Sequence, residues 1–145
     1  RKQSGGVGFL LLAPVAERLK TPLLVEAINR YESPLGHSLA DTWDIAGRAK
    51  SPYVWILPDT FHMNIEEVSM RQAIRDHRAC FGSFHLSDNN RYFPGFGAID
   101  FAAVIRMLDE VGYQGKLAIE GNTRESFVAD VEVAMRCLAP LLERT

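Results

Sequence analysis

The stretch HLSDNNRYFPGFGAID, residues 85–100, decides how the rest of the chain is organised. An apolar run ends at His85, a loop crowded with polar side chains and glycine follows, and Asp100 opens an amphipathic segment. This order predicts a strand, a loop and a helix, and the loop is longer than the roughly 2–6 residues that usually join a strand to the next helix. Long polar loops on a rigid scaffold often carry function. We therefore expect functional residues where strands end.

The same pattern recurs along the chain at intervals close to the roughly 30 residues of a βαβ unit. Short apolar runs precede the polar residues Glu26, Asp59, His85 and Glu120, and helix-like segments separate these runs. Such alternation indicates parallel βα units, and strands that are apolar throughout indicate a sheet covered on both faces. The two candidate folds are a doubly wound sheet and a (β/α) barrel. No glycine-rich phosphate loop follows the first run, which weakens the nucleotide-binding doubly wound fold.

Helix boundaries follow from spacing and end signals. Asn64 and Glu67 are spaced as in a capping box and predict a helix that runs to about residue 78. Asp100 is the expected N-cap of a helix with apolar residues at i, i+3, i+4 and i+7, which ends at Gly112. We expect strands at residues 23–25, 53–57, 81–85 and 117–119, and helices at residues 8–20, 38–49, 64–78, 101–111 and 128–142.

Composition favours one globular domain. The chain has 145 residues, 47% of them hydrophobic and 23% charged, with a formal net charge of −2. This balance argues against nucleic acid as a partner, and no run reaches the roughly 18–20 apolar residues of a membrane span. Cys80 and Cys137 lack metal-type spacing and are expected to be buried free thiols of a cytoplasmic protein. We expect residues 1–7 to be a disordered or expression-derived leader and residues 8–145 to form the domain.

The four polar residues that end the strands predict a metal site. In a barrel they converge at the C-terminal rim, where such enzymes carry out their chemistry. Three carboxylates favour Mg²⁺ and Mn²⁺, and one imidazole shifts the preference toward Mn²⁺, Co²⁺, Fe²⁺ or Zn²⁺. Mn²⁺ is the expected metal, with Co²⁺, Mg²⁺ or Zn²⁺ as alternatives. Any single one of these residues can instead serve as a helix cap or a salt-bridge partner.

Residues 26–32 (EAINRYE), residues 59–67 (DTFHMNIEE) and the loop at residues 85–100 resemble segments of the sugar isomerase and epimerase barrels related to xylose isomerase. The likeness is greatest to the ketose 3-epimerases that act on tagatose and psicose, and it runs in order from about residue 8 to residue 143. A complete TIM barrel has eight strands in about 250 residues. The resemblance therefore implies four βα units that form a half barrel, equivalent to the C-terminal half of the family.

The resemblance also implies a role for each site residue. It assigns the metal to Glu26, Asp59, His85 and Glu120, acid and base catalysis to Glu26 and Glu120, and contacts with substrate hydroxyls to Glu32, His62 and Arg91. The implied activity is that of a divalent-metal-dependent ketose 3-epimerase or sugar isomerase. In such a reaction carboxylates remove and return a proton beside a carbonyl, through an ene-diolate that the metal stabilises.

Other roles stay open for the residues around the metal. Asp88 is expected to orient His85 from behind the metal. His62 can instead be a loop histidine that bonds to backbone. Arg91 can instead pair with Asp88.

Two other functions compete with the epimerase. One is a non-catalytic half barrel that binds a metal or a sugar. The other is the barrel endonuclease of the same superfamily, which uses several zinc ions and many histidines, whereas this chain has 4. Four parallel strands in a half barrel leave exposed edges and an uncovered apolar face. We therefore expect a homodimer that completes the barrel, with small ketoses as ligands and neither nucleic acid nor a membrane as partner.

Overall fold

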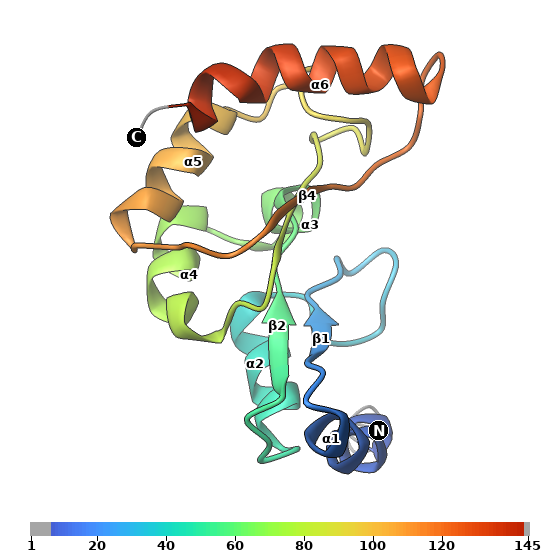
Figure 1. Cartoon of the computed structure of the whole chain (residues 1–145), viewed down its shortest axis with the longest axis vertical. Coiled ribbons are helices and arrows are strands. Elements are labelled where there is room, and N and C mark those ends of the chain that lie inside the picture. The colour runs from blue at the N-terminus through green and yellow to red at the C-terminus, as the bar shows by residue number, and fades with distance from the viewer. Residues whose placement is uncertain (1–6, 144–145) are drawn as a thin grey trace.

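Helices alternate with four short strands in the computed structural model, which describes residues 7–143 (Figure 1). The alternation predicted from the sequence is thereby confirmed. In chain order the elements are α1 (Val7–Leu19), β1 (Leu23–Glu26), α2 (Leu39–Gly47), β2 (Val54–Leu57), α3 (Thr60–Glu66), α4 (Met70–His77), the 3₁₀ turn η1 (Arg78–Cys80), β3 (Phe84–Leu86), α5 (Phe101–Glu110), β4 (Leu117–Ile119) and α6 (Phe127–Leu142).

All four strands run parallel, and each lies beside the strand that follows it in the chain. β1 pairs with β2, and β3 pairs with β4. Two bridges, Ile56 to Phe81 and Asp59 to His85, join the two pairs. The order β1-β2-β3-β4 is that of successive strands in a (β/α) barrel. Since all strands point the same way, the residues that end them lie along one edge.

Side-chain caps explain where most helices begin. Asp100 was predicted as the N-cap of α5, and its carboxylate accepts the backbone N–H of Ala103 at 2.9 Å. Gly112 follows α5 with a φ of 68°, a left-handed conformation that glycine adopts without strain. Side chains cap further helices in the same way, namely Ser38 for α2, Asp59 for α3, Ser69 for α4 and Ser126 for α6.

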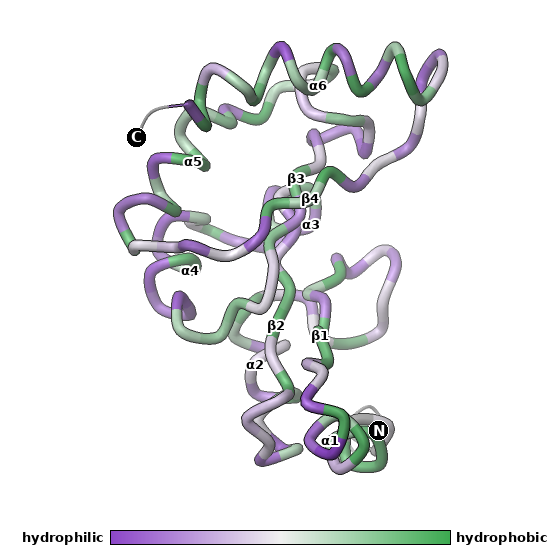
Figure 2. Tube along the Cα trace, viewed as in Figure 1, coloured by the Kyte–Doolittle hydropathy of each residue, from purple (hydrophilic) through white to green (hydrophobic). Residues whose placement is uncertain are grey.

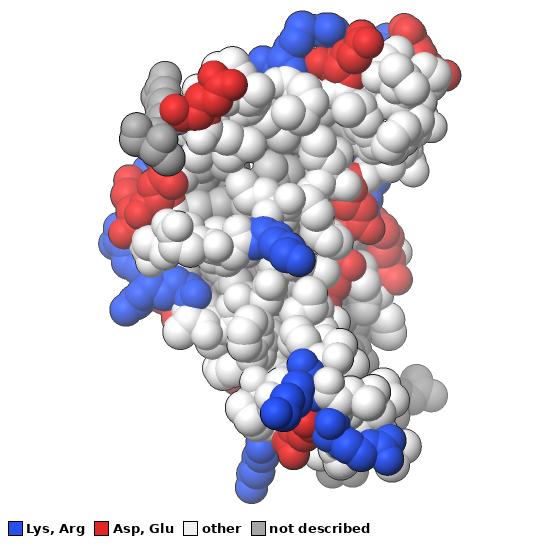
Figure 3. Space-filling model, in the orientation of Figure 1, with Lys and Arg blue, Asp and Glu red and all other residues white. Residues whose placement is uncertain are grey.

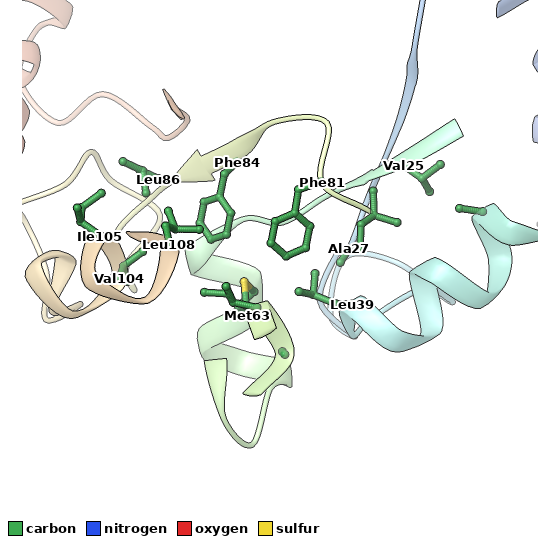
Figure 4. Close-up of a cluster of buried hydrophobic side chains, with 14 of the residues drawn as sticks. Val25, Ala27, Leu39, Met63, Phe81, Phe84, Leu86, Val104, Ile105 and Leu108 are labelled. Atoms are coloured by element: carbon green, nitrogen blue, oxygen red, sulfur yellow. The ribbon is translucent and has the colours of Figure 1, made fainter. Parts of the chain in front are cut away.

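The core lies between the strands and the helices that cover one of their faces (Figure 4). Phe84 of β3 is fully buried, and its ring meets those of Phe81 and Tyr113 edge-on, with centroids 6.0 Å and 6.3 Å away. Apolar residues of α5 pack against the same strand. In Figure 2 the hydrophobic colour follows β1 and β2 into this interior. The core thus holds the four strand ends in fixed positions.

The opposite face of β1 and β2 is open. Side chains alternate along a strand, so Val25 and Ile56 are buried while Leu24 and Trp55 are 39% and 41% exposed. Leu24 and Trp55 are partners in the strand register and lie beside each other. In Figure 3 much of the surface between α1 and α6 is uncharged, although basic atoms lie near its middle and acidic atoms along its right edge. The uncovered apolar face predicted for a half barrel is therefore present, and we call Leu24 and Trp55 the open face.

One helix predicted from the sequence is in fact two. Asn64 lies inside α3, so the predicted capping box with Glu67 is wrong. The Glu67 carboxylate instead accepts the backbone N–H of Leu39 at 2.8 Å and so caps α2. Asp59 begins α3, and Ser69 begins α4. The local spacing misled because a cap can be satisfied across the fold as well as along the chain.

The two terminal helices lie within one residue of their predicted bounds. α1 begins at Val7 and contains Pro14 in its interior, whereas residues 1–6 of the predicted leader lie outside the described residues. The apolar residues of α6 are only partly buried, since Leu138 is covered but Val128 and Met135 are 67% and 46% exposed. These exposed positions lie where a half barrel has no further elements to cover them.

The remaining sequence predictions concern thiols and membranes. Cys80 and Cys137 are free, but they are half-buried and not fully buried as expected. Burial raises the pKa of both thiols. Among residues 7–143, no helix combines the length and the apolar composition that crossing a bilayer requires. The cytoplasmic location stays a prediction.

Candidate active site

Four side chains from the ends of the four strands meet at one point. Glu26 ends β1, Asp59 follows β2, His85 lies in β3, and Glu120 directly follows β4. One oxygen or nitrogen atom from each lies within 4.8 Å of the others. The structure thus brings together the four residues that the sequence predicted, and we call them the strand-end cluster.

His85 makes the closest contacts within the strand-end cluster. Its Nδ1 lies 2.7 Å from Glu120 Oε2, 3.6 Å from Glu26 Oε1 and 3.9 Å from Asp59 Oδ2. The interaction with the Glu26 carboxylate, and then that with Glu120, raises the pKa of His85, although burial opposes the shift. Nδ1 is therefore the ring atom that faces the three carboxylates.

Asp59 has two structural roles in addition to its place in the cluster. It is fully buried, and its Oδ1 accepts the backbone N–H of Phe61 at 2.7 Å, which starts α3. Its Oδ2 accepts a hydrogen bond from Arg91 Nη1, also at 2.7 Å. The sequence left a metal ligand and a helix cap as alternatives, and the two oxygens allow both.

Arg91 is the cation that faces the strand-end cluster. Its guanidinium contacts Asp59 and lies 3.3 Å from Glu120 Oε2. The Cζ atom of Arg91 lies over the Phe61 ring, 5.0 Å from the ring centre. Its backbone is left-handed, with a φ of 66°. The N–H of Arg91 donates to the carbonyl of Asp88 at 2.9 Å, and its carbonyl accepts from the N–H of Asn122 at 2.7 Å. Such strained conformations persist where surrounding contacts hold them, often at functional sites.

The pKa values of two carboxyl groups in the strand-end cluster, Asp59 and Glu120, are shifted in opposite directions. Burial raises the pKa of Asp59 to about 6, although the hydrogen bond from Arg91 opposes the shift. Burial also acts on Glu120, but hydrogen bonds with Asp59 and His85 outweigh it and lower the pKa of Glu120. The pKa of Asp59 is thus raised while that of Glu120 is lowered, as is typical of neighbouring carboxyl groups that compete for the same positive charge.

His62 lies behind Glu26 in the same pocket. It is 2% exposed, and its Nε2 is 3.9 Å from Glu26 Oε1. Burial lowers the pKa of His62, and the positive charge of Arg91 adds to the shift. His62 is therefore neutral near pH 7. The alternative of a histidine bonded to backbone is present in the structure, since Nδ1 accepts the backbone N–H of Asn29 at 3.3 Å and also contacts its side chain at 2.7 Å.

Asp88 supports the loop and does not orient His85. It is 1% exposed, so its charge needs partners inside the protein. Its two carboxylate oxygens accept the backbone N–H groups of Asn89, Gly95, Gly97 and Ile99, at 2.8 to 3.1 Å. The predicted contact between Asp88 and His85 is thus replaced by a network inside the loop. The predicted pairing of the Arg91 and Asp88 side chains is also wrong, because they meet only through the backbone.

Glu32 lies at the exposed edge of the site. Its Oε1 accepts a hydrogen bond from Asn29 Nδ2 at 2.8 Å, and Asn29 in turn contacts His62. Sequence reasoning missed Asn29, which is fully buried despite its polar side chain. The available signal was its position midway between Glu26 and Glu32 in the EAINRYE segment.

A comparison with protein families agrees with this geometry. The model of the family described as "Xylose isomerase-like TIM barrel" matches residues 8–141. The chain belongs to this family. The partial (β/α) barrel that the sequence predicted is thereby confirmed as the fold.

Relatives within the xylose isomerase-like family are sugar epimerases. The 3-dehydro-D-guloside 4-epimerase of Escherichia coli K12 is 39% identical over 114 residues, which cover 79% of this chain and 44% of that protein. The D-psicose 3-epimerase of Enterocloster bolteae is 37% identical over 109 residues, covering 75% of this chain and 36% of that protein.

Solved structures that are similar to this chain are also those of sugar epimerases. An L-ribulose 3-epimerase superposes with a TM-score of 0.87 at 28% identity, covering 95% of this chain and 52% of that one. The 3-keto-D-glucoside 4-epimerase of E. coli has a TM-score of 0.84 at 35% identity, covering 94% of this chain and 51% of that one. This chain therefore spans about half the length of these relatives or less.

The residues of the strand-end cluster fit a divalent cation. Three carboxylates and one imidazole form a hard donor set that such ions accept. Among residues 7–143, Glu26 Oε1 is a buried oxygen without a hydrogen-bond partner. A buried carboxylate oxygen of this kind is unfavourable unless a cation or a proton accompanies it. The cluster can hold a metal ion through Glu26, Asp59, His85 and Glu120.

Proposed function

We propose that the chain is the metal-binding half of a barrel that epimerises a sugar carbon next to a carbonyl, as a divalent-metal-dependent ketose 3-epimerase. The observation that carries the proposal is the convergence of three carboxylates and one imidazole within 4.8 Å at the strand ends. The names of the relatives support it. Position 3 of psicose or ribulose and position 4 of a 3-dehydro sugar are both adjacent to the keto carbon. The common reaction is removal of an acidified proton and its return to the opposite face.

Glu26 and Glu120 are the proposed acid and base. They come from the first and the last of the four strands, so they approach a bound sugar from two sides. Glu26 Oε1 has no hydrogen-bond partner among the described residues, which leaves it free to take a proton. His85 and Arg91 contact Glu120 and help to keep it ionised. A positioned general acid or base typically contributes about 10²–10⁴-fold in rate.

The other polar side chains are proposed to bind the sugar. His62 offers an N–H and Arg91 a guanidinium toward substrate oxygens, and Glu32 accepts from a substrate hydroxyl at the exposed edge. A divalent cation bound to the strand-end cluster, with Mn²⁺ as the proposed metal, supplies positive charge that stabilises negative charge developing on the substrate oxygens. Two features hold the guanidinium in place, namely the Phe61 ring beneath it and the left-handed backbone of Arg91.

Deuterium exchange tests the proposal directly. The chain is incubated with Mn²⁺ in D₂O with free ketoses and with 3-keto glycosides, and deuterium at the carbon beside the carbonyl is measured by mass spectrometry. We expect incorporation by the parent and loss of it in Glu120→Gln, because the amide keeps the shape but cannot transfer a proton. The matched control is Glu132→Gln, an exposed position on α6 that leaves exchange unchanged. Equal exchange by Glu120→Gln and the parent contradicts the proposed role.

A second candidate function is a non-catalytic half barrel that binds a metal or sugar. The exposed open face favours it, because part of the pocket wall comes from elsewhere in a complete barrel. Calorimetry with ketose in the presence of Mn²⁺, combined with the deuterium-exchange measurement, distinguishes the epimerase from the non-catalytic half barrel. Binding together with exchange supports the epimerase, binding without exchange supports the second candidate, and the absence of both contradicts both.

The open face and the free strand edges also support a partner that completes the barrel. We propose a second copy of the chain, since closed two-fold dimers are the commonest oligomers. Light scattering at micromolar concentration is expected to give a dimer. Trp55→Lys places a charge on the open face and should dissociate it, whereas Val68→Lys, at a fully exposed position elsewhere, should not. A folded monomer in the parent contradicts the dimer.

A further inference from the structure

Asn29 occupies an unusual position for an uncharged polar residue. Its side chain is fully buried, and it lies three residues after Glu26 of the strand-end cluster. A buried amide is costly unless each of its polar atoms has a partner. In Asn29 each of them does, and the partners are Tyr31, Glu32 and His62.

The hydrogen bonds fix the orientation of the Asn29 amide. Its Oδ1 accepts the backbone N–H of Tyr31 at 2.9 Å. Its Nδ2 lies 2.8 Å from Glu32 Oε1, and a carboxylate can only accept. The same Nδ2 lies 2.7 Å from His62 Nδ1. The oxygen therefore faces Tyr31, and the two amide protons point at Glu32 and His62.

This orientation decides which nitrogen of His62 carries the proton. A second donor, the backbone N–H of Asn29, also points at His62 Nδ1 from 3.3 Å. Two N–H groups facing Nδ1 require that nitrogen to accept, so it has no room for a proton of its own. The ring proton then lies on Nε2, which faces the cluster 3.9 Å from Glu26 Oε1.

We propose that Asn29 is a positioning residue that holds His62 as the Nε2–H tautomer, so that His62 donates a hydrogen bond to a substrate oxygen and does not accept one. Glu32 assists by accepting the second amide proton of Asn29, which prevents the amide from turning over. The part concerning substrate rests on the proposed epimerase function. The tautomer itself depends only on contacts within this chain.

Nitrogen NMR of the metal-free full chain tests the tautomer. The chain is labelled with ¹⁵N-histidine, and correlations between ring nitrogens and carbon-bound ring protons distinguish a protonated from an unprotonated nitrogen. The chain has 4 histidines, and His62→Gln identifies the His62 signals by their loss. We expect an unprotonated Nδ1 and a protonated Nε2 in the parent. A protonated Nδ1 in the parent overturns the proposal whatever the variants do.

Asn29→Asp reverses the hydrogen bonding with little change in shape. The carboxylate can only accept, so it should draw a proton onto Nδ1 of His62. Asn64→Asp is the matched control, because Asn64 is exposed on the same helix as His62 and two residues from it. The control should keep the parent tautomer. A folded Asn29→Asp chain with the parent tautomer contradicts the proposal.

Kinetics separate this inference from the proposed function. In a preparation that exchanges deuterium into ketose, Asn29→Asp should lower kcat/KM by roughly 10- to 100-fold, as loss of a supporting hydrogen bond to an active-site ligand does, with Mn²⁺ affinity unchanged. An unchanged kcat/KM overturns the substrate role. Absence of exchange in the parent, with the expected tautomer, removes the epimerase proposal and leaves the role of Asn29 standing.

Discussion

Asp59 and Asp88 are both buried aspartates that follow a strand, yet their surroundings are opposite. Asp88 is enclosed by its own loop, and four backbone N–H groups satisfy its two oxygens. Asp59 lies in the strand-end cluster, among other acidic side chains and one histidine. Its carboxylate accepts a hydrogen bond from the Arg91 guanidinium. Burial alone therefore does not distinguish a functional from a structural carboxylate.

The two aspartates differ in the groups that bind their carboxylates. Backbone N–H groups stabilise the charge of Asp88 permanently, so the loop of residues 88–99 keeps its shape without a ligand. The strand-end cluster instead gathers more negative charge than its own partners offset, and Glu26 Oε1 lacks a hydrogen bond within the described part of the chain. The carboxylate oxygen of Glu26 that has no hydrogen bond among the described residues is therefore available to a cation.

Replacing Asp88 with alanine should have the largest effect on stability. The four N–H groups belong to exposed or half-buried residues, so water can reach part of them. At roughly 1 kcal/mol for each lost hydrogen bond, Asp88→Ala should lower the free energy of unfolding by about 3 kcal/mol. Urea denaturation followed by circular dichroism measures it. A loss below about 1 kcal/mol would show that water replaces the carboxylate easily, and the contrast with Asp59 would fail.

The strand-end cluster should make the stability of the metal-free chain depend on pH. Burial raises the pKa of Asp59 from 3.8 to about 6 in the folded chain without metal. Between these values the folded chain holds a proton on Asp59 that the unfolded chain has lost. The free energy of unfolding due to Asp59 therefore falls as the pH rises through this window, by on the order of 2 kcal/mol.

Asp59→Asn provides the comparison for this pH dependence, because the amide does not titrate. Urea denaturation of both chains, from below the lower pKa to above the higher one, should show the parent losing stability relative to the variant as the pH rises. A constant difference between the two chains, or a gain by the parent, contradicts the assigned shift.

Removing the charge of Glu26 from the strand-end cluster should have the smallest effect on stability. Glu26→Gln is expected to change the free energy of unfolding of the metal-free chain by no more than about 0.5 kcal/mol in either direction. One oxygen of Glu26 has no hydrogen bond to lose, and the substitution relieves repulsion between neighbouring carboxylates. A loss as large as that of Asp88→Ala would mean that the cluster is a structural centre like the loop.

The strand-end cluster was predictable from the sequence because it depends on local signals. Apolar runs that end in Glu26, Asp59, His85 and Glu120 identify the strand ends, and parallel βα topology brings such ends to one edge. The capping of α5 by Asp100 was predictable for the same reason, since the cap and its partner are three residues apart.

Roles that depend on distant contacts were not predictable in this way. Asp88 and its partners are separated by up to eleven residues, and only the folded loop brings Gly95 and Gly97 back to the carboxylate. Glu67 was predicted to cap its own helix and instead caps α2 by reaching Leu39 across the fold. Asn29 and His62 likewise meet only because β1 and β2 are neighbours.

Calorimetric titration of the metal-free chain with Mn²⁺ tests the central claim, that the strand-end cluster binds one divalent cation. The account predicts one ion per chain, and a loss of affinity of at least roughly 10-fold in His85→Ala, because outer contacts alone are worth that much. His77→Ala on α4 is the matched control and should bind like the parent. Binding by His85→Ala as tight as by the parent would contradict the account.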